Sequence, residues 1–142
     1  MPIQEVLLPL FVEVILTFSL MFLMATLRRR DFRAGVARYD NVALREPNWT
    51  KGTLQVSYAF ANQFELPVLF YVLTILAYVT HHAGYLFVAL AWVFVIFRLL
   101  HAFIHVTSNN VGVRGPLFGV SAVVLAIMWI IYIVEILTSP WV

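Results

Sequence analysis

The chain has 142 residues, of which 63% are hydrophobic and only 11% are charged, with a formal net charge of +2. Soluble domains carry about 25% charged residues, so this composition excludes an ordinary soluble domain and predicts an integral membrane protein. The chain contains no cysteine, which excludes disulfides and a thiol nucleophile supplied by the protein itself. At about 20 residues per spanning helix, four spans and their connections use the whole length.

Four apolar segments divide the chain, and we expect each to cross the bilayer once. They cover residues 6–27, 54–79, 85–106 and 114–137. The first contains a lone acid, Glu13, which we interpret as reaching the outer interface; the alternative is a role in a site or in a subunit contact. Inside the second, Pro67 removes a backbone donor and predicts a kink. Segment four starts near Arg114, with Pro116 in its first turn. The predicted fold is all-α, an antiparallel bundle of four transmembrane helices in a single domain, residues 1–142.

The connection between the first two spans, residues 28–51, is strongly basic. It holds six arginines and one lysine, and cytoplasmic loops of membrane proteins carry such an excess. We therefore predict that this loop is cytoplasmic and that both termini lie on the opposite side; in a bacterium this would be the inner membrane. Most of these arginines are interpreted as topology anchors. Arg28, Arg29 and Arg30 stand at the membrane edge, where one of them can also reach a polar site.

Polar residues recur at helical spacing within two of the spans. Arg98, His101 and His105 stand at i, i+3 and i+7, so they share one face of the third span. Asn62 and Glu65 share a face of the second span. Ionisable side chains at such depths are costly unless they face a polar cavity or a partner. This pattern predicts a polar site buried within the membrane.

Depth along each span indicates which groups meet. At 1.5 Å per residue, Asn62 and Glu65 lie roughly 12–16 Å from the cytoplasmic end of their span. On the same basis Arg98 lies about 13 Å in, His101 about 9 Å and His105 about 3 Å. We therefore predict an ion pair between Glu65 and Arg98, because burying either charge alone would cost several kcal/mol. A purely structural pair that fixes helix register is the alternative.

These two motifs, Asn62-x-x-Glu65 followed by Pro67 and Arg98-x-x-His101-x-x-x-His105 followed by Arg114, resemble those of the MAPEG family. The family comprises membrane-associated proteins in eicosanoid and glutathione metabolism, and the resemblance covers most of the chain. It implies a homotrimer that binds glutathione as cosubstrate between neighbouring subunits, near the cytoplasmic side. It also implies conjugation, peroxidase or isomerase chemistry on lipophilic substrates.

Carried over residue by residue, the resemblance implies a role for each polar group. Asn62 and Glu65 would contact the glutathione backbone, Arg98 would brace Glu65 or a glutathione carboxylate, and His101 would hydrogen-bond the peptide. Arg114 would lie nearest the sulfur as the main catalytic group, with His105 secondary and Arg28 a further binding residue. Because a guanidinium and a helix N-terminus both favour a thiolate, the position of Arg114 at the start of a helix suits this role.

Two other functions remain open at this point. One is a non-catalytic scaffold or binding protein of the same fold, favoured by His105 and Ala61, which stand where well-studied eukaryotic members have tyrosine and some members have arginine. The other is haem or metal binding by His101 and His105. Two histidines at i, i+4 on one helix are too close for bis-histidine haem, so we expect no metal site. A glutathione-dependent transferase or peroxidase is the favoured function.

Overall fold

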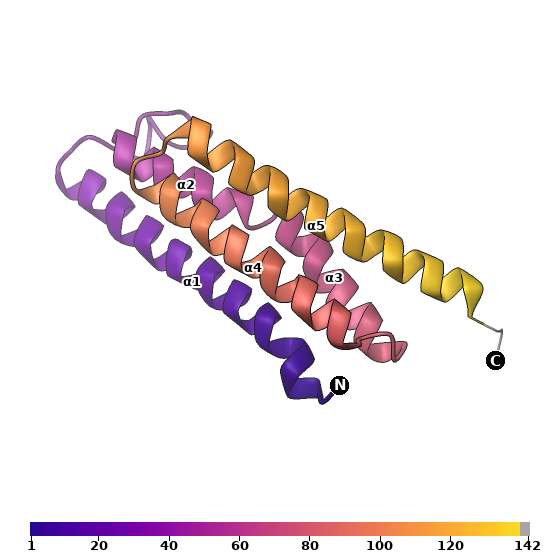
Figure 1. Cartoon of the computed structure of the whole chain (residues 1–142). Helices are drawn as coiled ribbons and strands as arrows, with labels where there is room; N and C mark the ends of the chain where they lie inside the picture. The colour runs from indigo at the N-terminus through magenta and orange to yellow at the C-terminus, as the bar shows by residue number, and fades with distance from the viewer. Residues whose placement is uncertain (140–142) are drawn as a thin grey trace.

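The computed structural model describes residues 1–139, and these fold into an elongated helical bundle (Figure 1). Its helices are α1 (Ile3–Arg33), α2 (Lys51–Asn62), α3 (Leu66–Val79), α4 (Tyr85–Val106) and α5 (Val111–Thr138). By length and apolar composition α1, the α2–α3 segment, α4 and α5 are each able to cross a membrane, which gives four spans in the described part of the chain. The predicted all-α fold with four spans is confirmed, and the protein is an integral multi-pass membrane protein.

The second span is interrupted between α2 and α3, at residues 63–65. Pro67 has no backbone N–H, and its ring crowds the preceding turn, so a continuous helix through this point is unfavourable. Glu65 leaves the helical region, with φ −101° and ψ −108°, and α3 restarts with the proline in its first turn, where proline is tolerated. The carbonyl of Asn62 accepts only a turn hydrogen bond along the backbone, from the N–H of Glu65 at 3.3 Å. The kink predicted at Pro67 is therefore a full break in the helix.

Several helix boundaries differ from the sequence prediction, among them the starts of α1 at Ile3 and of α2 at Lys51. The first helix continues to Arg33, beyond the predicted end at residue 27. The last helix begins at Val111 rather than near Arg114, because Asn110 caps it: its side-chain oxygen accepts the N–H of Gly112 at 3.0 Å. Pro116 consequently lies in the second turn of α5 and not in the first.

The basic loop folds back onto the ends of α1 and α2. Asp31 is 1% exposed, and its carboxylate accepts both the backbone N–H and the hydroxyl of Thr50 at 2.9 Å. Gly35 turns the chain out of α1 at φ +75°, a conformation that glycine adopts without strain. The guanidinium of Arg28 lies 5.0 Å from the ring centre of Trp49. The two ends of the loop are thus joined through Asp31 and Thr50.

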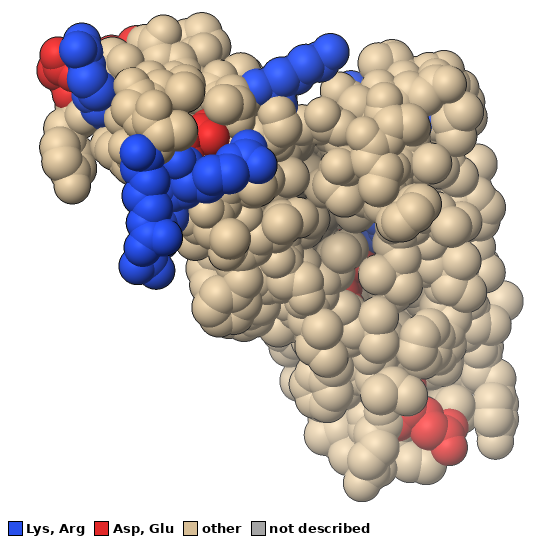
Figure 2. Space-filling model, turned by 90° about the vertical axis from the view of Figure 1, so that its left-hand side faces the viewer, with Lys and Arg blue, Asp and Glu red and all other residues tan. Residues whose placement is uncertain are grey.

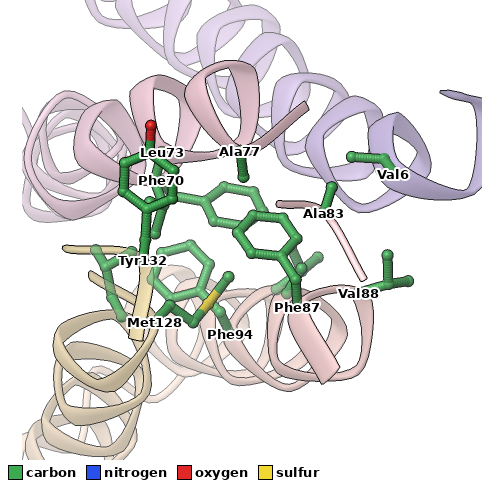
Figure 3. Packing of buried hydrophobic residues seen from close by; sticks show 13 residues of the cluster. Val6, Phe70, Leu73, Ala77, Ala83, Phe87, Val88, Phe94, Met128 and Tyr132 are labelled. Carbon is green, nitrogen blue, oxygen red and sulfur yellow. The ribbon is translucent and has the colours of Figure 1, made fainter. Parts of the chain in front are cut away.

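The main apolar core is shared by α1, α3, α4 and α5, as Figure 3 shows. At its centre the rings of Phe70 and Phe94 stack with their centroids 4.6 Å apart, and both side chains are fully buried. Leu73 and Met128 fill the space beside them. Because lipid tails are as apolar as these side chains, close packing rather than transfer from water stabilises such a core within a bilayer.

The outer surface of the bundle is apolar along the spans. Large side chains such as Ile15, Phe22 and Ile130 are more than half exposed, as expected for a surface that faces lipid. Figure 2 shows the Lys and Arg side chains gathered at one end over a largely uncharged flank. In Figure 1 the basic loop and the α4–α5 turn lie at that end, whereas the start of α1 and the α3–α4 turn lie at the other. The C-terminus itself, residues 140–142, is outside the described residues.

Candidate functional site

Arg98 on α4 is fully buried, and its acidic partner is Glu13 on α1. The Nε atom of Arg98 lies 3.8 Å from Oε1 of Glu13, and neither side chain is exposed. The interpretation that Glu13 reaches the outer interface is therefore wrong. Glu13 lies about 15 Å from the start of α1 at 1.5 Å per residue, and its side chain is directed into the bundle and not toward an interface. The prediction that Arg98 forms an ion pair with Glu65 is also wrong, because the acid paired with Arg98 is Glu13.

Asn62 ends α2 and Glu65 lies within the α2–α3 break. Arg98 is hydrogen-bonded to Asn62, which in turn contacts Glu65. One terminal nitrogen of Arg98, Nη2, donates to the side-chain oxygen of Asn62 and, at 3.4 Å, to its backbone carbonyl. The side-chain amide of Asn62 in turn donates to Glu65 Oε2 at 3.4 Å. Glu65 itself is exposed. Arg98 thus satisfies a backbone carbonyl that the break has released from regular helix bonding.

His101 connects α4 to the start of α5. Its Nδ1 lies 3.0 Å from the backbone oxygen of Arg114. A carbonyl oxygen only accepts, so the ring must donate from Nδ1, and in the neutral imidazole Nε2 is then left as an acceptor. That Nε2 atom is buried and has no partner among residues 1–139. An acceptor held in this way is suited to an amide N–H of a bound molecule.

Arg114 lies in the first turn of α5 and is partly buried. Its Nη1 donates to the side-chain oxygen of Asn109 at 2.6 Å, and Asn109 adopts φ +51°, which asparagine tolerates better than most residues. Gln55 on α2 donates to the carbonyl of Thr107 at 2.9 Å and so joins the α4–α5 turn to α2. The turn therefore fixes the Arg114 guanidinium beside the positive end of α5.

His105 and Phe118 complete the cluster. The ring of His105 lies 5.7 Å from that of His101, and its buried Nδ1 has no partner among the described residues. The ring of Phe118 lies 5.7 Å from the ring of His101 and 5.8 Å from the Arg98 guanidinium carbon. Phe118 was not predicted from the sequence, although its place four residues after Arg114, on the same helix face, was an available signal. Glu13, interpreted from the sequence as an interface residue with a site role as the alternative, is a further functional candidate.

Arg28 belongs to a different part of the molecule. It donates to the hydroxyl of Ser57 at 3.4 Å, and its buried Nε atom has no partner within residues 1–139. It lines a groove of about 600 Å³ between the end of α1, the basic loop and α2, together with aromatic and apolar side chains such as Trp49, Tyr58 and Phe64. The lining of this groove includes none of Asn62, Glu65, Arg98, His101, His105 and Arg114.

The predicted site residues therefore fall into two groups. Asn62, Glu65, Arg98, His101, His105 and Arg114 are linked by contacts among α2, α3, α4 and α5, whereas Arg28 lies with the groove on α1 and α2. Across the described residues no group of three or more His, Cys, Asp or Glu side chains has the arrangement of a metal site. The first group, the α4–α5 cluster, offers buried acceptors, an exposed carboxylate on the adjoining α2–α3 break and a guanidinium at a helix start.

The fold and this cluster define a class of protein: a small integral membrane bundle of four spans with a polar site carried by its second, third and fourth spans. The chain belongs to the MAPEG family, whose model matches residues 6–134, nearly the whole length. The family is one of glutathione-related membrane proteins, so the resemblance seen in the sequence motifs is confirmed at this level. Searches among curated proteins and among solved structures return no match.

Proposed function

We propose that this protein is a membrane-bound, glutathione-dependent transferase or peroxidase that acts on lipophilic substrates. The observation that carries the proposal is the contact between His101 and Arg114. The imidazole is hydrogen-bonded to the backbone oxygen of Arg114, so a free imidazole acceptor is held against the first turn of α5, which also carries the Arg114 guanidinium. One suits a peptide N–H and the other a thiolate, the two features that glutathione combines.

The roles of the remaining residues follow from their chemistry. Glu65 is exposed and anionic, so it suits the free amine of glutathione, and Asn62 beside it suits the peptide. Arg114 stabilises the thiolate, because a nearby guanidinium lowers the thiol pKa from its usual value of about 8.5 and the N-terminus of α5 adds to that effect. His105 is secondary. The chain has no cysteine of its own, so the reactive thiol must come from the cosubstrate.

Assembly into a homotrimer would bring the two groups of residues together. In one chain Arg28 lies in a groove whose lining excludes the α4–α5 cluster. A site formed between subunits lets Arg28 of one chain approach a glutathione held by the cluster of the next. The exposed apolar flanks of the spans leave a lipophilic substrate free to arrive sideways from the bilayer. We place loop 28–51 on the cytoplasmic side, by the positive-inside rule, where it attracts anionic glutathione.

Titration calorimetry of the detergent-purified protein with glutathione tests binding, and ultraviolet absorbance of the thiolate against pH tests the role of Arg114. We expect Arg114→Ala to raise the pKa of bound glutathione and to lower turnover by ~10²–10³, the usual loss for such an electrostatic group. Affinity should fall only modestly, because Asn62, Glu65 and His101 still hold the peptide. Arg33→Ala, at an exposed arginine near the end of α1, is the matched control. An unchanged thiolate titration in Arg114→Ala would remove this residue from the chemistry.

A non-catalytic scaffold of the same fold is the second candidate. It is favoured by the hydrogen bond that holds the Arg114 guanidinium to Asn109 and by the complete burial of Arg98, since both engage arginines within the chain. Calorimetry with glutathione distinguishes the scaffold from the enzyme. A scaffold would show no heat of glutathione binding in any variant, whereas the enzyme binds glutathione in the wild type and in the Arg33→Ala control.

A further inference from the structure

Four side chains form a continuous line from the centre of the bundle to its surface. Glu13 on α1 contacts Nε of Arg98 on α4, and Nη2 of the same guanidinium donates to Asn62. Asn62 then donates to the exposed Glu65. A planar guanidinium can engage two groups at once through different nitrogens held in fixed geometry, which a lysine ammonium on a flexible stem does poorly. The line therefore depends on arginine at position 98.

From this geometry we infer that Glu13 is a positioning residue, which sets the place of Asn62 and Glu65 by fixing the Arg98 guanidinium. It touches no ligand itself, because it is fully buried. The segment it acts on is the break at residues 63–65, which lacks regular helix hydrogen bonds and is thus the least constrained stretch of the second span. In a variant that lacks the Glu13 carboxylate, the Arg98 guanidinium would turn toward the exposed carboxylate of Glu65, which is hydrogen-bonded to Asn62.

Two variants separate this role from simple stability. Glu13→Gln keeps the size of the side chain and removes its charge. Arg98→Lys keeps a positive charge facing Glu13 but loses the second nitrogen that reaches Asn62. Glu5→Gln is the matched control, since Glu5 is an exposed acid on the same helix.

The first readout is independent of glutathione. The cysteine-free chain accepts a spin label at Phe64→Cys, an exposed position within the break, and at Val79→Cys, an exposed position at the far end of α3. We expect Glu13→Gln and Arg98→Lys each to mobilise the label at position 64 and to leave the label at position 79 unchanged. A general loss of stability would mobilise both labels.

The second readout, which rests on the proposed function, is calorimetry with glutathione. We expect the dissociation constant to rise about 10-fold in Glu13→Gln and in Arg98→Lys, the effect of weakening one hydrogen bond to a charged group, and to stay constant in Glu5→Gln. If the wild type binds no glutathione, the proposed function fails and the spin labels alone decide the inference. An unchanged label at position 64 in both variants overturns it, as does equal mobilisation at positions 64 and 79.

Discussion

The ion pair between Glu13 and Arg98 makes a quantitative prediction about stability. Both side chains are fully buried, so replacing one by leucine leaves the other as an uncompensated charge. We expect Glu13→Leu to lower the free energy of unfolding by about 3–5 kcal/mol, the usual effect of breaking a buried pair. Arg98→Leu should cost a further ~1–3 kcal/mol, because it also removes the donor to the Asn62 carbonyl.

The double variant discriminates between a coupled pair and two independent residues. With both charges gone and two leucines packed in their place, only the lost donor to Asn62 remains, so the cost should be ~1–3 kcal/mol. The double variant should therefore be more stable than either single variant. The assay is unfolding in mixed detergent micelles against increasing dodecyl sulfate, followed by circular dichroism.

Glu65→Gln serves as the control in the same cycle. Because Glu65 is exposed and its side chain bonds only to Asn62 among residues 1–139, its substitution should change stability within about 0.5 kcal/mol. If the destabilisation in the double variant equals the sum of those in the single variants, the two residues do not interact and the assignment of the pair is refuted. A large loss of stability in Glu65→Gln would instead support Glu65 as the ion-pair partner of Arg98.

Three further predictions follow from the fold. Cysteines introduced singly at Asn41 and His82 should react with an impermeant reagent from opposite sides of the membrane; labelling of both from outside would refute the cytoplasmic placement of loop 28–51. Mass measurement in detergent should give a homotrimer, and an active monomer would contradict a site shared between subunits. Asp31→Asn should lower the free energy of unfolding by about 1–3 kcal/mol, because a buried charged acceptor of two Thr50 hydrogen bonds becomes neutral. Limited trypsin digestion should then cut the basic loop faster than in the wild type. Unchanged cleavage would show that Asp31 does not hold the loop.

The sequence predicted the spans and the break well because both depend on local chemistry. Length and apolar composition define a membrane helix, and the missing N–H of Pro67 acts on the turn just before it. The motifs on α4 and α5 also led to residues that do meet, His101 and Arg114, since short turns between antiparallel helices leave little freedom in how the two ends approach.

The partner of Arg98 could not be obtained in the same way. Depth arithmetic gives the height of a residue in the bilayer but not the direction in which its side chain points around the helix axis. Glu65 matches Arg98 in depth, but it lies on the exposed face of the second span. Glu13 was interpreted as an interface residue because it is a lone acid in the first span, and a single acid forms no periodic pattern that would indicate its partner.

The burial of Arg98 also has a consequence for how the protein is made. An arginine at the centre of a nascent membrane helix costs about 2.5–3.5 kcal/mol on insertion, so α4 carries a penalty as it leaves the translocation channel. The acid that compensates it lies on α1, which is synthesised first. We therefore expect α4 to partition into the membrane efficiently only when α1 is already inserted and lies next to the channel. In an in vitro translation and glycosylation assay, a chain with Glu13→Leu should leave a larger fraction of α4 uninserted than the wild type does.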